Sequence, residues 1–417
     1  MNMHSALALI AATAAGAHAQ QVSLQMLGNI YPLDMSADGT VIVGNDFVYE
    51  TVRWTESGGL VNLGRGTQSL GRGAGTPDVS DDGTRVSASI ITSDGQYVTQ
   101  GVWTEGQGWT ELMPPPPADG GLIDLAYGSA WGISGDGQQL VGLYWRPNDF
   151  ANGGAHASIA STPGGVTDLG SSGGNSRANH ANYDGSVIVG WDEGTGGVWQ
   201  PTVWENGVLT RLPTEEAFTE ATHVNPAGDI IGGYVYDTIF GYFPAALWDR
   251  TPTGWDLRVL GTLFGTTGPF GLASVGGMTP DGSIVVGYNR FNPSASTGFI
   301  WTEDDGMEDI KVWLTDRGIT IPAQLLILDL TCISADGLIM AGIGVNRNNG
   351  FPQGFRIVIT PACAADWNKD GLVNFFDVSG FIADFNAADP AADLNGDTLF
   401  NFFDVAEFIA IYNAGCP

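Results

Sequence analysis

The sequence predicts a mainly β fold: a seven-bladed β-propeller of four-stranded antiparallel blades, followed by a small α-helical module. Three observations predict it. A turn phrase, usually built on Asp-Gly, recurs along the first 360 residues; the chain is rich in glycine and poor in charge; and the composition changes abruptly after Pro361.

The overall composition favours many short strands over long helices. The 417 residues include 61 glycines, and only 14% of the chain is charged. Such a sequence is typical of strands joined by tight turns, while a hydrophobic content of 43% excludes wholesale disorder.

The first 19 residues have the features of a secretory signal peptide. Ala6 to Ala15 form an apolar run too short to span a bilayer, and Ala17-His18-Ala19 offers small residues for cleavage before Gln20, although the segment before the run lacks Lys and Arg. No later segment is long and apolar enough to be a transmembrane segment. We therefore expect a secreted, extracellular protein, free or attached at the cell surface.

The chain is strongly acidic, with a formal net charge of −30 from 15 Lys plus Arg against 45 Asp plus Glu. Its field repels phosphate backbones, which argues against nucleic acid as a partner, and it attracts divalent cations. For most of the chain, the acidity can equally serve solubility alone.

The turn phrase has a small or polar residue before Asp-Gly and an apolar run ending in glycine after it, as in MSADGTVIVG from Met35. The Asp-Gly pair suits the positive-φ positions of a tight hairpin that joins two strands. The turn glycines, at intervals of 43 to 55 residues, are Gly39, Gly83, Gly137, Gly185, Gly228, Gly282 and Gly337.

A second phrase follows most copies of the first. It contains an apolar strand usually carrying Trp, a glycine turn, and a short strand often ending in Leu-Gly, as in VRWTESGGLVNLG ending at Gly64. Each repeat therefore supplies four strands, and units of this length are typical of propeller blades. The Trp residues of this phrase are expected in the core.

The two ends of the repeat region complement each other. The last unit, from about Leu326 to Thr360, lacks a fourth strand, and VSLQMLG ending at Gly28 has the pattern of an orphan fourth strand. Pairing them would close the ring and remove two exposed sheet edges. We expect the propeller to span residues 20–360 and to close in this way.

The two phrases resemble the HAF-type extracellular repeat, a bacterial family built on a DGSVIVG … AFxW … LG unit. The resemblance covers residues 22 to 360. It implies an extracellular repeat protein in which each blade is one HAF-like repeat.

Aromatic residues recur just after the second strand of several repeats: Tyr144, Trp145, Trp191, Tyr234 and Tyr288. Equivalent blade positions would bring them to one rim, where rings can stack on a sugar face or on a protein partner. We regard them as a candidate ligand rim, with packing between blades as the alternative.

Two similar segments after Pro361 place oxygen-bearing side chains at loop positions 1, 3, 5, 9 and 12, each before an apolar helix pattern. With the backbone carbonyl of position 7, this alternation approaches the roughly six to eight oxygen ligands that Ca²⁺ prefers. Asx turns that cap helices would explain one such residue but not two matched sets. The expected ligands are Asp366, Asn368, Asp370, Leu372, Asn374 and Asp377 in the first loop, and Asp393, Asn395, Asp397, Leu399, Asn401 and Asp404 in the second.

The two segments resemble a dockerin type I module of the variety with a Gly-Cys tail, here Gly415-Cys416, within residues 361–417. The resemblance implies an EF-hand-like module with two bound Ca²⁺ ions and a docking face on its duplicated helices. Thr398 stands in place of the glycine at position 6, so the second site is expected to be the weaker.

Two phenylalanine pairs, Phe375-Phe376 and Phe402-Phe403, stand where cohesin-recognising dockerins often have small hydroxyl residues. The resemblance therefore points to a protein partner other than a standard cohesin. We expect one Phe of each pair in the core of the module and the other in a docking patch.

The chain has three cysteines. Cys363 and Cys416 bracket the C-terminal module and are natural disulfide partners in an oxidising compartment. Cys332 lies in an apolar strand pattern and is expected to be a buried, unreactive thiol.

Signals of catalysis are poor. The GxSxG match at residues 170–174 is not followed by the helix that a nucleophile elbow requires, and His156, His180 and His223 have no metal-binding spacing. The sequence thus predicts a non-catalytic binding or scaffold protein with a calcium-dependent C-terminal docking or anchoring module. The alternative is an extracellular carbohydrate-active or glycan-binding protein, because paired carboxylates for sugar hydrolysis stay open.

Overall fold

The computed structural model describes residues 21–66, 75–113, 128–145, 154–161, 165–194, 196–214, 218–239, 241–263, 271–292, 295–360, 363–368 and 372–415. The signal peptide predicted at residues 1–19 lies outside them. The chain divides into one compact unit, Ser23–Val358, and a second unit that contains the residues from Ile359 onward.

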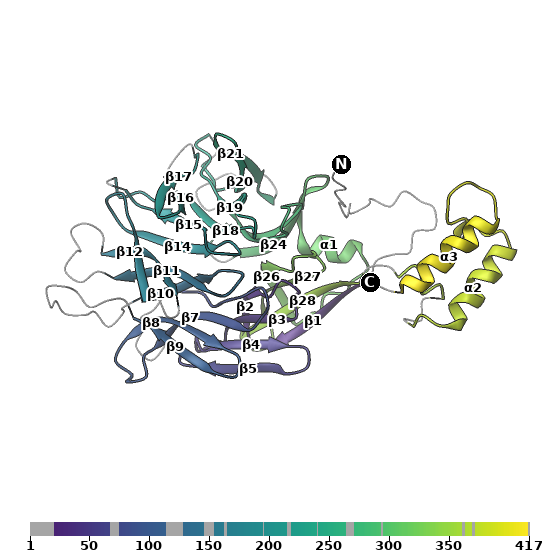
Figure 1. Ribbon diagram of the computed structural model, residues 1–417, viewed down its shortest axis with the longest axis horizontal. Coiled ribbons are helices and arrows are strands. Elements are labelled where there is room, and N and C mark those ends of the chain that lie inside the picture. Colours follow the sequence, from purple (N-terminus) through teal and green to yellow (C-terminus); the bar gives the residue numbers. More distant parts are fainter. Residues whose placement is uncertain are drawn as a thin grey trace. The chain divides into compact units, whose positions relative to one another are not determined.

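The larger unit is a seven-bladed β-propeller of four-stranded antiparallel sheets, as predicted (Figure 1). Six of its sheets are continuous in sequence, with their strands in chain order. Their strands are β2 (Tyr31–Met35), β3 (Val41–Asn45), β4 (Thr51–Thr55) and β5 (Gly59–Gly64); β6 (Asp78–Val79), β7 (Arg85–Ile91), β8 (Val98–Thr104) and β9 (Gly108–Leu112); β10 (Gly128–Ile133), β11 (Gln139–Trp145), β12 (Ala155–Ser161) and β13 (Gly165–Gly170); β14 (Ser176–Ala181), β15 (Val187–Asp192), β16 (Gln200–Glu205) and β17 (Val208–Arg211); β18 (Glu220–Val224), β19 (Ile230–Tyr234), β20 (Ala245–Thr251) and β21 (Gly254–Gly261); and β22 (Leu272–Met278), β23 (Ile284–Asn292), β24 (Ala295–Thr302) and β25 (Gly306–Asp309).

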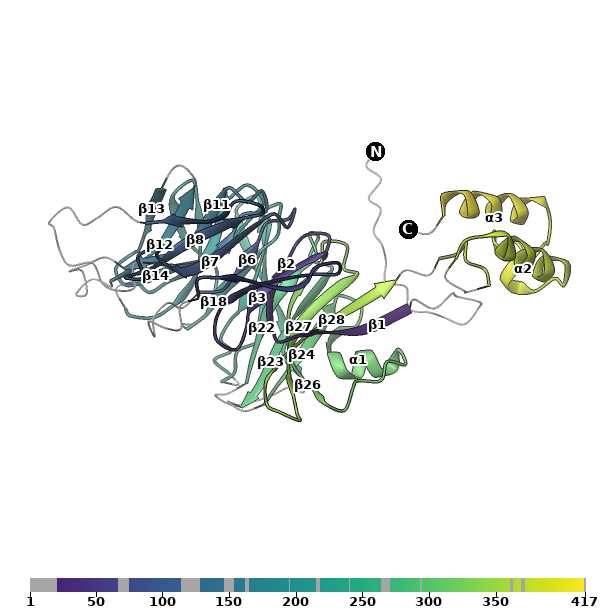
Figure 2. The ribbon, with the colours of Figure 1, turned by 90° about the horizontal axis from the view of Figure 1, so that it is seen from below.

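The seventh blade joins the two ends of the repeat region, which confirms the predicted closure. Its order is β1-β28-β27-β26, so the first strand of the propeller lies beside the last (Figure 2). Arg356 Nε donates to Gln25 Oε1 at 2.6 Å across this pairing. The strands are β26 (Leu325–Ile333), β27 (Ile339–Asn346), β28 (Pro352–Thr360) and β1 (Gln21–Gly28).

The turn phrase joins the first two strands of each blade. In the first blade, Ser36 Oγ accepts from the Val41 N–H at 3.0 Å and donates to Asp38 Oδ1 at 2.6 Å, while Gly39 takes a φ of +68°. The side chains therefore satisfy the backbone of the turn, and glycine supplies the left-handed position at low cost.

Backbone hydrogen bonds between turns link neighbouring blades. In five of the seven blades, as far as the structure describes them, the residue after the polar residue of the turn, or in one blade the residue after that, donates its N–H to the carbonyl of the corresponding residue in the next blade. These bonds run from Ala335 to Ala37 (2.8 Å), from Ala37 to Asp81 (3.0 Å), from Asp81 to Gly135 (2.9 Å), from Asp136 to Tyr183 (2.8 Å) and from Tyr183 to Pro226 (3.2 Å).

The glycine that ends the apolar run of the turn phrase lies very close to the backbone of the inner strand. A Cβ at Gly190 would collide with the carbonyl oxygen of Arg177 on the neighbouring inner strand, and a Cβ at Gly233 with that of Glu220. The inner strand bulges at this point, since the register of β14 on β15 shifts between Ala178 and His180. The same bulge occurs in every blade but the second.

The core of the propeller lies between neighbouring blades. The Trp residues of the second phrase fill it: Trp204 and Trp248 are at most 1% exposed, and Trp54 and Trp301 are buried as well. One short helix, α1 (Ile310–Asp316), follows the sixth blade and is capped by the Asp309 side chain, which accepts from the Lys311 N–H.

The C-terminal unit contains α2 (Phe375–Asn386), the 3-10 helix η4 (Pro390–Ala392) and α3 (Phe402–Ala414). Its core is aromatic. Phe381 and Phe408 stack with ring centroids 4.1 Å apart, and the Trp367 ring meets both edge-on. Within the described residues, no helix is both long and apolar enough to cross a membrane.

Candidate functional site

One column of the repeat gathers chemically active side chains. This position lies two residues before the polar residue of the turn, which is Ser36 in the first blade, and directly after the bulge of the inner strand. In chain order the column is Asp34, Asp78, Gly132, His180, His223, Gly277 and Cys332. Because inner strands surround the propeller axis, residues far apart in sequence meet there.

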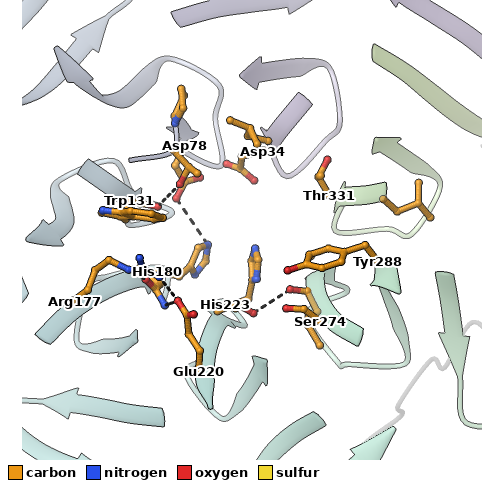
Figure 3. Close-up of a pocket in the computed structure, with 18 residues that line it drawn as sticks. Asp34, Asp78, Trp131, Arg177, His180, Glu220, His223, Ser274, Tyr288 and Thr331 are labelled. Carbon is orange, nitrogen blue, oxygen red and sulfur yellow. Dashed lines mark hydrogen bonds and ion pairs between the residues drawn. The ribbon is translucent and has the colours of Figure 1, made fainter. Parts of the chain in front are cut away.

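Two adjoining cavities of about 230 and 340 Å³ lie at this column. Both are lined by Asp34, Asp78, His180 and His223. Figure 3 shows these side chains converging from the inner strands of the first, second, fourth and fifth blades. The bulge aims a second set of side chains into the first cavity: Leu33, Trp131, Asn179, Thr222 and Thr331.

Two carboxyl groups lie side by side in the column. The Val79 N–H is shared between Asp34 Oδ2 and Asp78 Oδ1, both at 2.8 Å, and the Ile133 N–H donates to Asp78 Oδ2 at 2.9 Å. Burial raises the pKa of Asp78 well above its usual range, and the charge of Asp34 and a hydrogen bond to it raise it further. Asp78 therefore keeps its proton to higher pH than an exposed carboxyl does.

Two imidazoles lie next to the carboxyl pair. The His180 and His223 ring centroids are 5.2 Å apart, and His180 Nε2 is 4.0 Å from Asp78 Oδ2. Burial lowers the pKa of His180; burial and the neighbouring His180 lower the pKa of His223 to about 3. Both rings are thus neutral near pH 7. His223 bonds the backbone of Val275, and its Nδ1 is buried with no hydrogen-bond partner in the described structure.

The cation of the first cavity is fully engaged. The Arg177 guanidinium lies 3.7 Å from the centroid of the Trp131 ring, is paired with Glu220, and donates from Nε to Asn179 Oδ1 at 2.7 Å. The Tyr234 hydroxyl also donates to Glu220, at 3.1 Å. The guanidinium therefore anchors the wall of the cavity, while Trp131 Nε1 has no hydrogen-bond partner among the residues that the structure describes.

The five residues of the candidate ligand rim divide into two groups. Trp191, Tyr234 and Tyr288 occupy equivalent register positions opposite the inner strands. Tyr288 lines the first cavity, whereas Trp191 is 6% exposed and stacks on Trp199 with centroids 4.7 Å apart. The other two lie away from the cavity: the Tyr144 hydroxyl donates to Asp168 of the outer strand, and Trp145 is exposed at the end of β11.

The predicted calcium loops have matched helix caps. Asn374 and Asp377 form a capping box at α2, and Asn401 and Asp404 form the same box at α3. Capping thus accounts for positions 9 and 12 in both loops, whereas the sequence argument allowed helix-capping Asx turns for one such residue only. Positions 1, 3 and 5 need a different explanation.

In the second loop, positions 1, 3 and 5 are drawn together. The Asp397 N–H is shared between Asp393 Oδ1 at 3.1 Å and Asn395 Oδ1 at 2.9 Å, and Thr398 has a φ of +65°. The donor set is all oxygen, which fits a hard cation such as Ca²⁺. As they stand, however, no three His, Cys, Asp or Glu side chains among the described residues could hold a metal ion. In the first loop, Asp370 lies outside the described residues.

The expectation for the phenylalanine pairs was half wrong. No Phe of either pair is in the core: Phe375, Phe376, Phe402 and Phe403 are 71%, 67%, 74% and 67% exposed. The core is formed instead by Trp367, Phe381 and Phe408, with Phe385 and Phe400 packed against them.

Two remaining predictions concern sulfur and serine. Cys332 is buried, which confirms its expected place in the core, and burial raises the pKa of its thiol. Cys416 lies outside the described residues, so the disulfide with Cys363 stays a prediction. Ser172 of the GxSxG match lies between β13 and β14 and is bonded to Asp192 and Arg211; no helix follows it.

No protein-family model matches this chain, and no curated protein matches it. An oligogalacturonate lyase from Vibrio parahaemolyticus has a similar structure, with 12% identity over 82% of this chain and 97% of that chain and a TM-score of 0.49. An oligogalacturonate lyase in complex with manganese is 14% identical over 82% of this chain and 91% of that one, with a TM-score of 0.49. TolB from Acinetobacter baumannii is 14% identical over 66% of this chain and 61% of that chain, with a TM-score of 0.40. These likenesses concern the propeller fold alone.

Proposed function

We propose that the chain is a secreted, non-catalytic binding protein: the propeller is a scaffold, and the C-terminal module docks a protein partner in a calcium-dependent way. The observation that carries this proposal is the exposure of two matched phenylalanine pairs, each of whose rings is at least 67% exposed. Exposed clusters of large apolar side chains mark interaction sites.

The position of the pairs links them to the metal. Each pair opens a helix directly after its capping asparagine, between positions 9 and 12 of a proposed calcium loop. Leu372 and Leu399, at position 7 of the loops, are also exposed, at 66% and 62%. Calcium that orders each loop would therefore fix the exposed apolar side chains at that loop, one leucine and two phenylalanines. We call the two sets together the apolar docking patch.

Calcium would be held by the side chains at loop positions 1, 3 and 5 and by the carbonyl of position 7. It supplies charge neutralisation among carboxylates that otherwise repel one another. The proposed calcium binding is supported by the all-oxygen donor set of Asp393, Asn395 and Asp397 together with the dockerin-like pattern. We also propose that the blades are HAF-like repeats and that the signal peptide directs secretion.

The charge of the module defines the partner. Between Cys363 and Cys416 the sequence has eight Asp and one Glu against one Lys. An apolar patch on an acidic module fits a protein surface that is apolar at its centre and rich in Lys and Arg at its edge.

The test uses the full chain as bait against the envelope of the producing organism, with calcium or with EDTA. The captured protein is then purified and titrated against the wild type, a Phe402→Ser/Phe403→Ser variant, and an Ile239→Ser control that removes an exposed apolar side chain, 81% exposed, from the propeller. The proposal expects calcium-dependent binding that the phenylalanine variant loses and the control keeps. Binding that survives EDTA or the loss of the pair contradicts it.

The non-catalytic part of the proposal is supported by the state of the candidate nucleophiles and cation. Cys332 is buried with a raised pKa, Ser172 is bonded to Asp192, and Arg177 is paired with Glu220. The carbohydrate-active alternative expects polysaccharide cleavage that Asp78→Asn abolishes. The scaffold proposal expects no cleavage by the wild type, as measured by released reducing ends and by absorbance of unsaturated products.

A further inference from the structure

We propose that the axial cavities bind one small organic cation through a primary ammonium group that lies against Asp34 and Asp78. The inference concerns the propeller and does not depend on the docking module. It begins with the groups that surround the column of the repeat.

Unsatisfied acceptors favour a ligand that donates hydrogen bonds. His223 is neutral and bonds Val275, so its buried, unpartnered Nδ1 is left as an acceptor beside both cavities. The carboxyl oxygens of Asp34 and Asp78 line both cavities too. An unmet buried acceptor costs stability that a ligand N–H can recover.

The charge of the cavities favours a cation over a neutral donor. Asp34, Asp78 and Asp81 all line the second cavity. Burial raises the pKa of Asp81, and the charges of Asp34, Asp82 and Asp136 raise it further. The carboxyl groups around the axis thus repel one another, and a positive charge between them would relieve that repulsion.

An anion is excluded by the same residues. Among the described residues, the guanidinium that lines the first cavity is that of Arg177, and it is committed to Glu220, Asn179 and the face of Trp131. The two histidines are neutral near pH 7 because burial lowers the pKa of each. No lining group of either cavity therefore offers a free positive charge.

Cation binding has a proton consequence. Asp78 holds a proton because its burial, and then the neighbouring charge of Asp34, disfavour its ionised form. An ammonium beside the pair stabilises both carboxylates, so the proton passes to the buffer as the ligand enters. A neutral hydroxyl ligand would leave that proton in place.

The test titrates the full chain with butane-1,4-diamine and, separately, with butane-1,4-diol, a neutral probe of the same length. Calcium is present to occupy the C-terminal loops, and about 0.15 M salt screens attraction to the acidic surface. The expected result is one diamine bound per chain, release of protons detected by comparing buffers of different ionisation heat, and no binding of the diol.

Two variants locate the site. In Asp34→Asn the side-chain carbonyl can still accept from the Val79 N–H, so we expect folding to be kept and diamine affinity to fall about tenfold or more. Asp94→Asn removes one carboxylate from an exposed turn between β7 and β8 and should leave affinity unchanged. Absence of saturable diamine binding, equal binding of the diol, binding without proton release, or equal effects of the two variants would overturn the proposal. If Asp34→Asn does not fold, the probe comparison and proton release on the wild type still decide it.

Discussion

The Asn225 side chain replaces a backbone donor that Pro226 lacks. Asn225 Nδ2 donates to the carbonyl of Pro280 at 2.7 Å, and its Oδ1 accepts from the Ile230 N–H at 3.0 Å within its own turn. The ring of bonds between turns thus continues from the fifth blade to the sixth, although proline has no N–H to give.

This relationship predicts that Asn225→Ser destabilises the propeller more than Asn182→Ser. A serine hydroxyl can still accept from the turn backbone, as Ser36 does, but it cannot reach the next blade. Asn182 makes its side-chain bonds within its own turn, so it is a matched control. We expect a difference of about 1 kcal/mol in the free energy of unfolding, measured by urea denaturation. Equal losses would refute the bridging role.

The bulges predict which glycines tolerate a methyl group. At Gly190 a Cβ would collide with the Arg177 backbone carbonyl, which cannot move without disturbing the sheet. At Gly196 a Cβ meets nothing within 4 Å, and φ there is not positive. Gly190→Ala should therefore cost about 2–4 kcal/mol of unfolding free energy and Gly196→Ala less than about 0.5 kcal/mol. A small effect at Gly190 would show that the bulge is not rigid.

The neutral histidines predict a loss of stability in acid. The pKa of His223 is about 3 in the folded chain, against about 6.5 when unfolded. Between these values the unfolded chain binds a proton that the folded chain does not, so stability falls as pH drops below about 6.5. Asp78 acts in the opposite direction, since its pKa is raised by folding. His223→Asn should make the midpoint of urea unfolding less dependent on pH between 7 and 5; an unchanged slope contradicts the buried neutral ring.

The left-handed backbone conformation of Thr398 predicts that a glycine at this position would increase the calcium affinity of the second loop. Thr398 has a φ of +65° at the sharp turn of the second loop, a conformation that costs a residue with a side chain about 1 kcal/mol. Thr398→Gly should therefore tighten calcium binding at this loop by about fivefold, whereas Thr398→Ala, which keeps the Cβ, should not. Calcium titration of both variants compares them; equal affinities would mean that the turn is not strained.

Metal removal should act on one unit of the chain. We expect EDTA to speed hydrogen exchange in α2 and α3, whose first turns follow the calcium loops, and to leave the strands of the propeller unchanged. Mass spectrometry of peptides from residues 375–386 and 402–414, compared with peptides from residues 187–205, measures this. Unchanged exchange in the helices would separate their folding from the metal.

The fold was largely predictable from the sequence, because the same pattern of strands and turns recurs in every repeat. Gly39 and its equivalents identify the hairpin. The last unit, which ends at Thr360, lacks a fourth strand, and the spare strand ending at Gly28 matches it. Boundaries and α1 were not predictable in this way, since Ile310–Asp316 occurs in one repeat alone.

The axial column was visible in the sequence but was missed. His180 and His223 were judged by their spacing along the chain, whereas their meaning lies in their shared position two residues before Asn182 and Asn225. Aligning the repeats on the turn would have placed them with Asp34 and Asp78. Their direction toward the axis could not be foreseen, because the bulge that turns them depends on pairing with the next strand.

The predicted burial of one phenylalanine from each pair was wrong for a different reason. Four exposed aromatic side chains are unfavourable for an isolated module, so burial of one from each pair was the natural expectation. Which aromatic residues fill a small core depends on helix packing, and here Phe381 and Phe408 stack at its centre.

Calcium titration of the full chain by isothermal calorimetry tests the central functional claim most directly, because both the loops and the docking patch depend on the metal. We predict two bound ions in the wild type, one in an Asp393→Ala/Asp397→Ala variant, and two in an Asp94→Ala control. Absence of calcium binding in the wild type, or two ions still bound by the loop variant, would contradict the account.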